Sequence, residues 1–239
     1  MWPRKAAASR LQHIRMSERL FRFKQFAVSH SASAMKVGTD GVSLGAWAPC
    51  GGRVLDAGCG CGLIGLMAAQ RGAESVVMVD IDAASAAEAR SNAAASPWSE
   101  RVSAVCADFL TFESDVKFDN IISNPPFFAT GLQAPDSRRA AARHDDAMPP
   151  EAFMTRSAAL LAPEGRLSVI LPPDREKEWT FAAGLAGLHP VEAAELLTKP
   201  GAPPRRVMLV FGRSGPSLAR TRLALNSDEY KRLTEPFYL

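Results

Sequence analysis

The chain has 239 residues, of which 47% are hydrophobic and 22% charged, and its formal net charge is +3 at pH 7. This length can bury one sizeable hydrophobic core, so we expect one domain with short extensions. No apolar run approaches the roughly 20 residues of a membrane-spanning helix, and residues 1–24 lack the apolar stretch of a secretory signal. The composition argues against a membrane protein and predicts a soluble, cytoplasmic one.

The start of the chain is basic. Residues 1–24 carry seven cations and one acid, Glu18, which gives +6, so the remainder of the chain carries −3. A basic arm on a near-neutral body suits attraction to nucleic-acid phosphates, and Arg22 and Lys24 are candidate RNA contacts. The alternative is a solvated, disordered tail. A natural start at Met16 would remove half of the arm.

The cysteines do not have the spacing of a metal site. Cys50, Cys59, Cys61 and Cys106 include no C-x-x-C pair. A structural zinc site would need better spacing and partners. We assign no metal and no disulfide, and expect small buried or loop thiols in a reducing compartment.

Strand-like and helix-like segments alternate through the centre of the chain. The hydrophobic pattern predicts strands at Arg53–Asp56, Ser75–Asp80, Val102–Cys106, Phe118–Ser123 and Arg166–Leu171. It predicts helices at Leu63–Arg71, Ala83–Ala95, Glu151–Leu161 and Arg175–Leu185. This alternation is typical of a parallel, doubly wound α/β sheet.

The alternation ends after the last of these helices. Val191–Thr198 and Arg205–Gly212 are two strand-like runs joined by a turn rich in proline, with no helix between them. They predict a hairpin and therefore an antiparallel edge. Phe21–Ala48 looks like an N-terminal cap over the sheet.

A parallel sheet that ends in an antiparallel hairpin resembles the class I methyltransferase fold, which is Rossmann-like and has seven strands. We therefore expect a basic arm and one methyltransferase domain. The expected divisions are an arm at 1–24, the domain at 25–239, and within it a cap at 25–50, a catalytic core at 51–213 and a tail at 214–239.

The first chemical motif is a glycine-rich run, Asp56-Ala57-Gly58-Cys59-Gly60-Cys61-Gly62, between the first strand and the first helix. Glycines allow a tight turn and let the backbone approach a ligand beyond the carboxyl end of a strand. With an acid before it, the run resembles the S-adenosylmethionine loop of methyltransferases. That resemblance assigns cofactor binding to Gly58, Gly60 and Gly62, with Asp56 orienting the loop and the methionyl ammonium of the cofactor.

Acidic residues follow the next two strands. Asp80, at the tip of the second, can accept both ribose hydroxyls of the cofactor, and Ile81 beside it joins that site. Asp82 suits the N-cap of the following helix instead. Asp108 can accept the adenine amine and Phe109 can pack on the adenine ring, although Asp108 alone could equally be a helix cap.

The most discriminating segment is Asn124-Pro125-Pro126-Phe127, after the fourth strand. An aromatic or amide NH2 is a poor nucleophile because its lone pair is delocalised. The Asn124 side-chain carbonyl and the Pro125 backbone carbonyl could accept its two N–H bonds and aim the lone pair at a methyl group, and the prolines pre-organise them. Phe127 offers a face for a flat base. These four residues are the catalytic candidates, with Asn124 also at the cofactor; a simple turn is the alternative.

The same motif occurs in methyltransferases of adenine N6, guanine N2 and glutamine N5, with Tyr more common than Phe at its fourth position. Other segments resemble the bacterial tRNA1(Val) (adenine(37)-N6)-methyltransferase family more closely. They are Phe23–Val28, Met35–Ala48, Ser96–Arg101 and Phe237–Leu239. The resemblance implies a cytoplasmic enzyme that uses S-adenosylmethionine to methylate N6 of the adenosine beside a tRNA anticodon. It also places four residues over the methionine end of the cofactor, namely Lys36, Gly38, Thr39 and Asp40.

Further cations could contact RNA. Arg138, Arg139 and Arg143 follow the Asn-Pro-Pro-Phe motif in what looks like a substrate-side loop, for which a solvated loop is the alternative. The Arg205-Arg206 pair is another candidate, with a structural role equally open.

The sequence is compatible with three hypotheses of function. Methylation of adenine N6 in tRNA accounts for the motif, the cap and the end of the chain. Methylation of guanine N2 in ribosomal RNA or of glutamine N5 in a protein would use the same motif. A non-catalytic RNA-binding module would have no use for the glycine loop.

Overall fold

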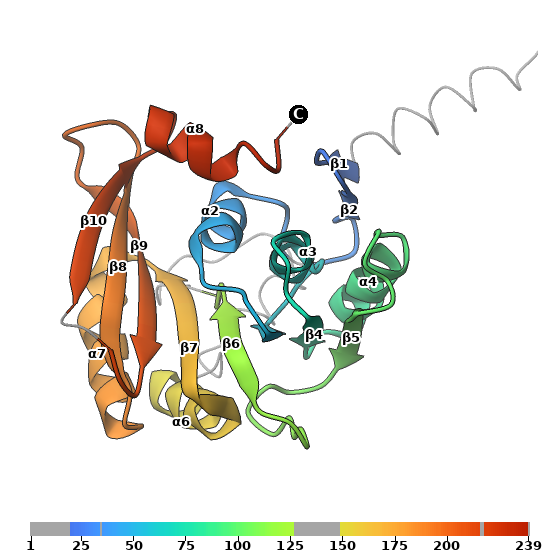
Figure 1. Cartoon of the computed structure of the whole chain (residues 1–239), viewed down its shortest axis with the longest axis horizontal. Coiled ribbons are helices and arrows are strands. Elements are labelled where there is room, and N and C mark those ends of the chain that lie inside the picture. Colours follow the sequence, from blue (N-terminus) through green and yellow to red (C-terminus); the bar gives the residue numbers. More distant parts are fainter. Residues whose placement is uncertain (1–19, 34, 127–148, 216–217, 239) are drawn as a thin grey trace, which may run out of the picture.

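A large mixed sheet runs through the centre of the chain (Figure 1). It is seen in a computed structural model that describes residues 20–33, 35–126, 149–215 and 218–238. Its strands are β3 (Arg53–Ala57), β4 (Ser75–Asp80), β5 (Val102–Cys106), β6 (Phe118–Ser123), β7 (Leu161–Leu171), β8 (His189–Leu197), β9 (Pro204–Gly212) and β10 (Ala219–Ala224). They lie in the order β10-β8-β9-β7-β6-β3-β4-β5.

The pairing of these strands confirms the predicted fold class. β6 pairs with β3 and β7, β4 pairs with β3 and β5, and all four pairs are parallel. β9 is antiparallel to both β7 and β8, so the predicted hairpin supplies the antiparallel part of the sheet. From β3 in the middle of the sheet, the chain first adds β4 and β5 on one side and then β6 and β7 on the other. The strand order therefore reverses beside β3, and doubly wound sheets bind their ligands at such a point.

The sheet has eight strands, so the expected count of seven was too low. The eighth, β10, lies within the segment expected to be a tail and pairs in parallel with β8. The sequence of β10 is too polar to be recognised as a strand. In the structure Arg220 pairs with Glu176 and Glu195, and Arg222 pairs with Glu195 at 2.8 Å. Charges along an edge strand also discourage pairing with another chain.

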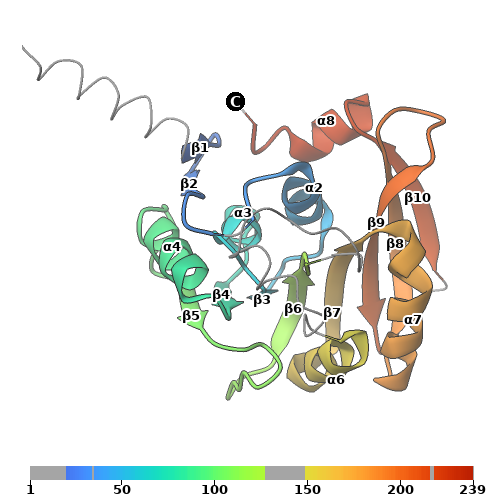
Figure 2. The same ribbon diagram turned by 180° about the vertical axis from the view of Figure 1, so that it is seen from behind.

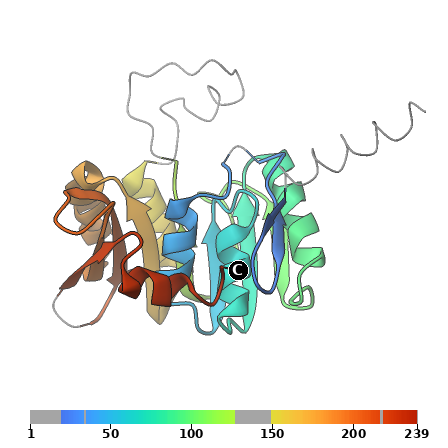
Figure 3. The same ribbon diagram turned by 90° about the horizontal axis from the view of Figure 1, so that it is seen from above.

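Helices cover both faces of the sheet. The helices of the described residues are α2 (Thr39–Trp47), α3 (Leu63–Gln70), α4 (Ala83–Ala94), α6 (Pro150–Leu160), α7 (Glu176–Leu185) and α8 (Asp228–Thr234), with a 3-10 turn η1 (Pro173–Arg175). α2, α3, α4 and α8 share one hydrophobic core, and α6 and α7 share the other. Figures 1 and 2 show the two layers, and Figure 3 looks onto the layer of α8, α2 and α3. None of the described helices is long and apolar enough to cross a membrane.

Three of the segments that resemble the methyltransferase family meet in one aromatic cluster. They are Phe23–Val28, Ser96–Arg101 and the end of the chain at Phe237 and Tyr238. The rings of Phe23 and Phe26 stack with centroids 4.6 Å apart, Trp98 lies edge-on to Phe26 at 5.7 Å, and Tyr238 stacks on Phe23 at 6.1 Å. Phe23 and Phe26 flank the turn between β1 (Leu20–Arg22) and β2 (Ala27–Ser29), which are antiparallel. The two ends of the described chain therefore pack on each other over the α3–α4 layer.

Candidate active site

The predicted site residues follow strands that are neighbours in the sheet. β6, β3, β4 and β5 are adjacent and parallel, so their carboxyl ends lie side by side. Backbone hydrogen bonds connect these ends, because the Gly58 amide donates to the Val79 carbonyl at 2.8 Å and the Ala107 amide donates to the Asp80 carbonyl at 3.0 Å. The glycine loop and the two acidic strand ends thus form one continuous row, as a ligand site at the switch of strand order requires.

The glycine loop has the backbone that its composition predicted. Gly58, Gly60 and Gly62 have φ values of 71°, 54° and 82°, a region that residues with a side chain rarely enter. A Cβ on Gly62 would also lie 2.9 Å from the Met78 sulfur. Alternate left-handed residues turn the chain sharply from β3 into α3, and the space where a Cβ of Gly58 or Gly60 would stand is open.

Asp56 holds this loop from below. One carboxylate oxygen accepts a 2.8 Å hydrogen bond from the Gly65 amide in the first turn of α3. At this end of a helix the helix dipole stabilises a negative charge. Burial raises the pKa of Asp56 to about 7; the Gly65 hydrogen bond opposes that rise and the Asp80 charge adds to it. Asp56 is 0% exposed. Asp56 therefore orients the loop. Its other carboxylate oxygen is buried and has no hydrogen-bond partner among the described residues, so contact with a methionyl ammonium stays a prediction.

Asp80 braces the loop from the tip of β4. Its two oxygens accept hydrogen bonds from the Gly60 amide at 2.7 Å and the Asp82 amide at 2.9 Å. Burial raises the pKa of the partly exposed Asp80. Asp82 caps α4 by accepting from the Ser85 amide at 2.8 Å, which confirms its predicted role. Ile81 between them is 72% exposed, so its apolar side chain is free to pack on a flat ring.

The residues after β5 divide between the site and the core. Asp108 accepts a 2.9 Å hydrogen bond from the Leu110 amide, so its side chain closes the local turn and remains partly exposed. Phe109 is only 3% exposed, and its ring packs 5.0 Å from that of Phe153. The expected stacking of Phe109 on an adenine ring is therefore wrong. Ile81 remains an exposed apolar group at this end of the sheet.

Asn124 presents an acceptor that nothing in the described chain uses. The Ser123 hydroxyl donates to the Ala57 carbonyl at 2.7 Å and fixes the end of β6 against β3. The next residue, Asn124, has a buried Oδ1 without a hydrogen-bond partner among the described residues. An unsatisfied buried acceptor costs roughly 1–3 kcal/mol, so such an atom is expected where a ligand supplies the donor. Pro125 is buried and Pro126 is half-buried, and Phe127 lies outside the described residues.

The N-terminal cap (residues 20–33 and 35–48) reaches the glycine loop through α2. Gly38 is the extended N-cap of α2, and Thr39 and Asp40 form its first turn. A Cβ on Gly41 would lie 3.2 Å from Leu63, the first residue of α3, so the two helices start side by side. This segment of the cap therefore opens a helix next to the glycine loop.

Two charged cap residues are already partnered within the chain. Lys36 donates to the His30 carbonyl at 2.6 Å, which closes the segment before α2 on itself. Asp40 accepts from Arg206 of β9 at 2.8 Å. This ion pair gives Arg206 the structural role that the sequence left open beside RNA contact.

The expected RNA contacts fall into three groups. Lys24 donates to the Glu235 carbonyl at 2.7 Å and pairs with its carboxylate, so its charge fixes the C-terminal end of the chain rather than standing free. Arg22, in β1, is exposed. The remaining candidates, Arg138, Arg139 and Arg143, lie outside the described residues.

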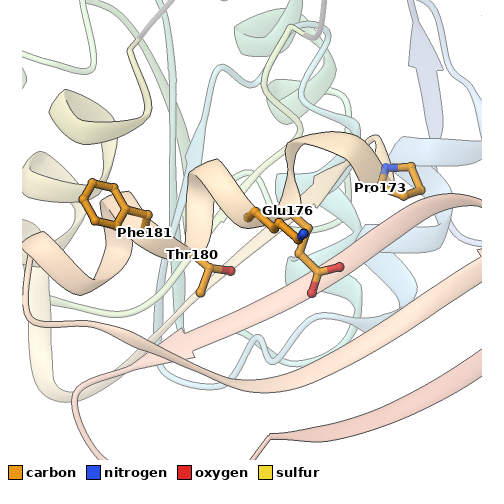
Figure 4. Close-up of a pocket in the computed structure, with 5 residues that line it drawn as sticks. Pro173, Glu176, Thr180 and Phe181 are labelled. Atoms are coloured by element: carbon orange, nitrogen blue, oxygen red, sulfur yellow. The ribbon is translucent and has the colours of Figure 1, made fainter.

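A separate open pocket lies along α7 (Figure 4). It is lined by Pro173, Glu176, Lys177, Thr180 and Phe181. None of these residues belongs to the predicted site, and the glycine loop is not part of its wall. The row of strand ends around Gly58–Gly62, rather than this pocket, is the candidate active site.

Sequence reasoning missed two polar residues that support this site. Glu88 and Asn92 lie one turn apart on α4 and are 8% and 5% exposed. Both bind the segment before α2. A charged residue and an amide four positions apart in an otherwise alanine-rich helix were the available signal.

Comparisons with known proteins agree with this geometry. Residues 44–182 match the Methyltransferase small domain family. The chain is 42% identical over 235 residues to a Bacteroides fragilis protein named tRNA1(Val) (adenine(37)-N6)-methyltransferase, covering 94% of this chain and 99% of that one. An Aeromonas hydrophila protein of the same name is 40% identical over 229 residues, covering 92% and 97%.

Solved structures share the fold at lower identity. A predicted O-methyltransferase of Agrobacterium tumefaciens superposes with a TM-score of 0.61 at 22% identity, over 83% of this chain and 96% of that one. A 16S rRNA N2 methyltransferase of T. thermophilus, solved with AdoMet and guanosine, gives 0.54 at 23% identity, over 82% and 50%. These structures show the shared fold, and the sequence matches show that the chain belongs to the tRNA1(Val) (adenine(37)-N6)-methyltransferase family.

Proposed function

We propose that this protein transfers a methyl group from S-adenosylmethionine to N6 of an adenine in tRNA, and that its target is adenine 37 of tRNA1(Val). The observation that carries the proposal is the buried Oδ1 of Asn124 directly after β6, which has no hydrogen-bond partner within the described part of the chain. An acceptor in that place suits an amine with N–H bonds to donate. The names of the relatives support adenine in tRNA as the source of that amine.

The strand ends suit the parts of the cofactor. The left-handed glycine loop exposes backbone to the methionine portion, and the Asp80 carboxylate at the tip of β4 suits the ribose hydroxyls. Ile81 offers an apolar surface to the adenine ring of the cofactor. Asp108 offers an acceptor to the adenine amine. When bound, S-adenosylmethionine supplies a methyl group attached to a positively charged sulfur. Lys36, Gly38, Thr39 and Asp40 of the cap would cover its methionine end.

The chain's own residues would position the target amine. Asn124 Oδ1 and the Pro125 carbonyl accept hydrogen bonds from the two N–H groups of this amine. These two hydrogen bonds draw the nitrogen toward tetrahedral geometry and free its lone pair. Pro125 and Pro126 restrict the backbone, so these acceptors are pre-organised rather than gathered by the substrate. The bound cofactor would supply the methyl group to this nitrogen, and the extra proton of the methylated amine would leave to solvent. No basic side chain is required for that order of events.

Other substrates of the same chemistry are the competing hypotheses. Guanine N2 and glutamine N5 also present an NH2 group to paired acceptors, and Asn124 alone does not distinguish them. The resemblance of the cap and of the chain end to the relatives favours adenine in tRNA. A non-catalytic RNA-binding module is disfavoured, because it has no use for three left-handed glycines or for an unsatisfied Asn124.

Methylation of tRNA from a strain that lacks this gene tests the proposal. The protein is incubated with labelled S-adenosylmethionine and total tRNA, which is then digested and analysed by nucleoside mass spectrometry. N6-methyladenosine in the anticodon fragment of tRNA1(Val) is the expected product. Label in guanine of ribosomal RNA or in glutamine of a protein would keep the fold and overturn the substrate. Failure to bind S-adenosylmethionine in calorimetry would favour the non-catalytic module.

Arg22 is the described cation that we propose as a tRNA phosphate contact, since Lys24 beside it is engaged with Glu235. Arg22→Ala should lower tRNA affinity and reduce the salt dependence of binding by about one unit of slope. Lys24→Ala is the matched variant and should change tRNA affinity less. Equal losses in both variants would contradict this assignment.

A further inference from the structure

The carboxylate of Glu88 sits in a ring of donors from the segment between β2 and α2. One oxygen accepts from the Ser31 amide at 2.7 Å, the Ala32 amide at 3.0 Å and the Ser29 hydroxyl at 2.9 Å. The other oxygen accepts from the Ser33 amide at 2.8 Å. Successive amides that converge on one anion form a concave site for negative charge, and here the protein fills that site with its own side chain.

Asn92, one turn further along α4, binds the same segment and the glycine loop together. Its Oδ1 accepts from the Ser29 amide at 2.9 Å, and its Nδ2 donates to the Ser29 carbonyl at 2.8 Å. The same Nδ2 donates to the Cys61 carbonyl at 2.8 Å. One buried amide therefore ties the cap to the loop that turns between β3 and α3.

Charge holds the remainder of the segment in place. Lys36 donates to the carbonyls of His30 and Ser31, on the other side of the peptide groups whose amides face Glu88. The Val37 amide donates to His30 Nδ1 at 3.2 Å. The peptide groups of this segment are thus polarised between a carboxylate and an ammonium, and α2 begins immediately after it.

We propose that Glu88 and Asn92 are positioning residues that hold residues 29–33 and 35–37 beside the glycine loop in the arrangement that receives the methionine end of S-adenosylmethionine. The inference rests on the proposed function, because it concerns the same cofactor. Neither residue needs to touch the cofactor. Both act through the backbone of the cap, which they fix before the cofactor arrives, so less ordering is needed on binding.

Glu88→Gln is the first test, because it keeps the size of the side chain. It removes the charge and turns an NH2 group toward one of the amide donors, so the ring of hydrogen bonds cannot remain complete. We expect the dissociation constant for S-adenosylmethionine, measured by calorimetry, to rise at least tenfold. The value of kcat at saturating cofactor should change less than twofold. Asn92→Ala should have the same signature.

Hydrogen exchange of the protein without cofactor gives a readout independent of activity. The amides of Ser31, Ala32 and Ser33 should exchange faster in Glu88→Gln than in the wild type, while those of β3 and β4 should not. Glu74→Gln is the matched control, since Glu74 is exposed and precedes β4 at the opposite end of the sheet. It should change neither the cofactor affinity nor the exchange of the cap.

The outcomes separate this inference from the proposed function. If the wild type binds S-adenosylmethionine and Glu88→Gln binds it equally well, the positioning role is wrong and the proposed function stands. If both variants lose kcat with unchanged cofactor affinity, the two residues do not act on cofactor binding and the inference is again wrong. If the wild type does not bind S-adenosylmethionine, the proposed function fails and this inference fails with it.

Discussion

The Asp80 carboxylate and the Gly60 amide are joined by a 2.7 Å hydrogen bond, so the tip of β4 and the glycine loop form one unit. The same carboxylate also accepts from the Asp82 amide. Asp80 thus shapes the loop before any ligand binds, and its partial exposure leaves it available to ribose hydroxyls. Asp82, two residues later, differs in that its carboxylate caps α4.

This difference predicts opposite effects of two neighbouring substitutions. Asp80→Ala should raise the dissociation constant for S-adenosylmethionine by at least tenfold, or about 1.4 kcal/mol, because both the loop brace and the ribose acceptor are lost. Asp82→Ala should lower the free energy of unfolding by about 1 kcal/mol through the lost N-cap and affect affinity less. Calorimetry and urea unfolding measure the two effects. Unchanged affinity in Asp80→Ala would show that another residue holds the ribose.

Asn124 and Ser123 offer a second pair of neighbours with opposite expectations. Asn124→Ala should lower kcat by about 10²–10³-fold while the affinity for S-adenosylmethionine stays the same, because it removes an acceptor needed at the reacting nitrogen. Its melting temperature should not fall, since the lost Oδ1 has no hydrogen-bond partner among the described residues. Ser123→Ala should instead lower the melting temperature, because it breaks the bond to the Ala57 carbonyl. Full turnover by Asn124→Ala would refute the role of its side chain.

Asp56 gives a prediction about pH. Its pKa is raised from 3.8 to about 7 in the folded protein, so between these values the folded state binds more protons than the unfolded state. The free energy of unfolding should therefore fall as pH rises, by up to about 1.4 kcal/mol per unit. Asp56→Asn should remove this loss and be the more stable protein at pH 7.5. Urea unfolding of both proteins from pH 5 to 7.5 tests it, and parallel pH profiles would contradict the assignment.

The pH range of that experiment lies above the range in which a second carboxyl, that of Glu88, titrates with a pKa shift of opposite direction. The amides and the Ser29 hydroxyl around Glu88 lower its pKa below 4.5 despite its burial. Its contribution to stability is present above that value and is lost as pH falls through the lower folded pKa. Over most of the range from pH 5 to 7.5 Glu88 therefore contributes little to the pH dependence of stability, and what it contributes is present in both Asp56→Asn and the wild type.

The central sheet could be predicted closely because each strand and helix carries its own local pattern. Ser75–Asp80, Val102–Cys106 and Phe118–Ser123 have the predicted bounds in the structure. β10 could not be predicted in this way, since its partners are distant in the chain: it pairs with β8, and its arginines form ion pairs with Glu176 and Glu195. Local sequence does not contain such pairings.

The candidate site was predictable to the extent that it follows strand ends. Gly60 and Asp80 occupy the places that the motif implied, whereas Phe109 turned inward because Phe153, on a distant helix, gives its ring a partner. Glu88 and Asn92 gave only a weak signal, because most of their partners are backbone groups, which any sequence could supply. A motif therefore locates a site. Residues such as Glu88 and Asn92, which fix the cap beside the site, are recognised only in the three-dimensional structure.

The cysteines differ in exposure in a way that reports on this site. Cys59 and Cys61, in the glycine loop, are buried, and burial raises the pKa of Cys59 and raises that of Cys61 to about 11. Burial also raises the pKa of Cys50. Cys106 is exposed at the end of β5, with its sulfur 3.7 Å from the Ile81 carbonyl. Since a thiolate is the reactive form, only Cys106 should react quickly in the native protein.

Labelling with iodoacetamide at pH 8 tests this expectation. Peptide mass spectrometry should find Cys106 alkylated at least tenfold faster than the other three cysteines, and all four alkylated at similar rates in urea. Saturating S-adenosylmethionine should slow the labelling of Cys106, because the adenine that we place beside Ile81 and Asp108 would cover it. Cys106→Ser is the control and should remove the fast phase. Rapid labelling of Cys59 or Cys61 in the folded protein would mean that the glycine loop opens, which its hydrogen bonds to Val79 and Asp80 oppose.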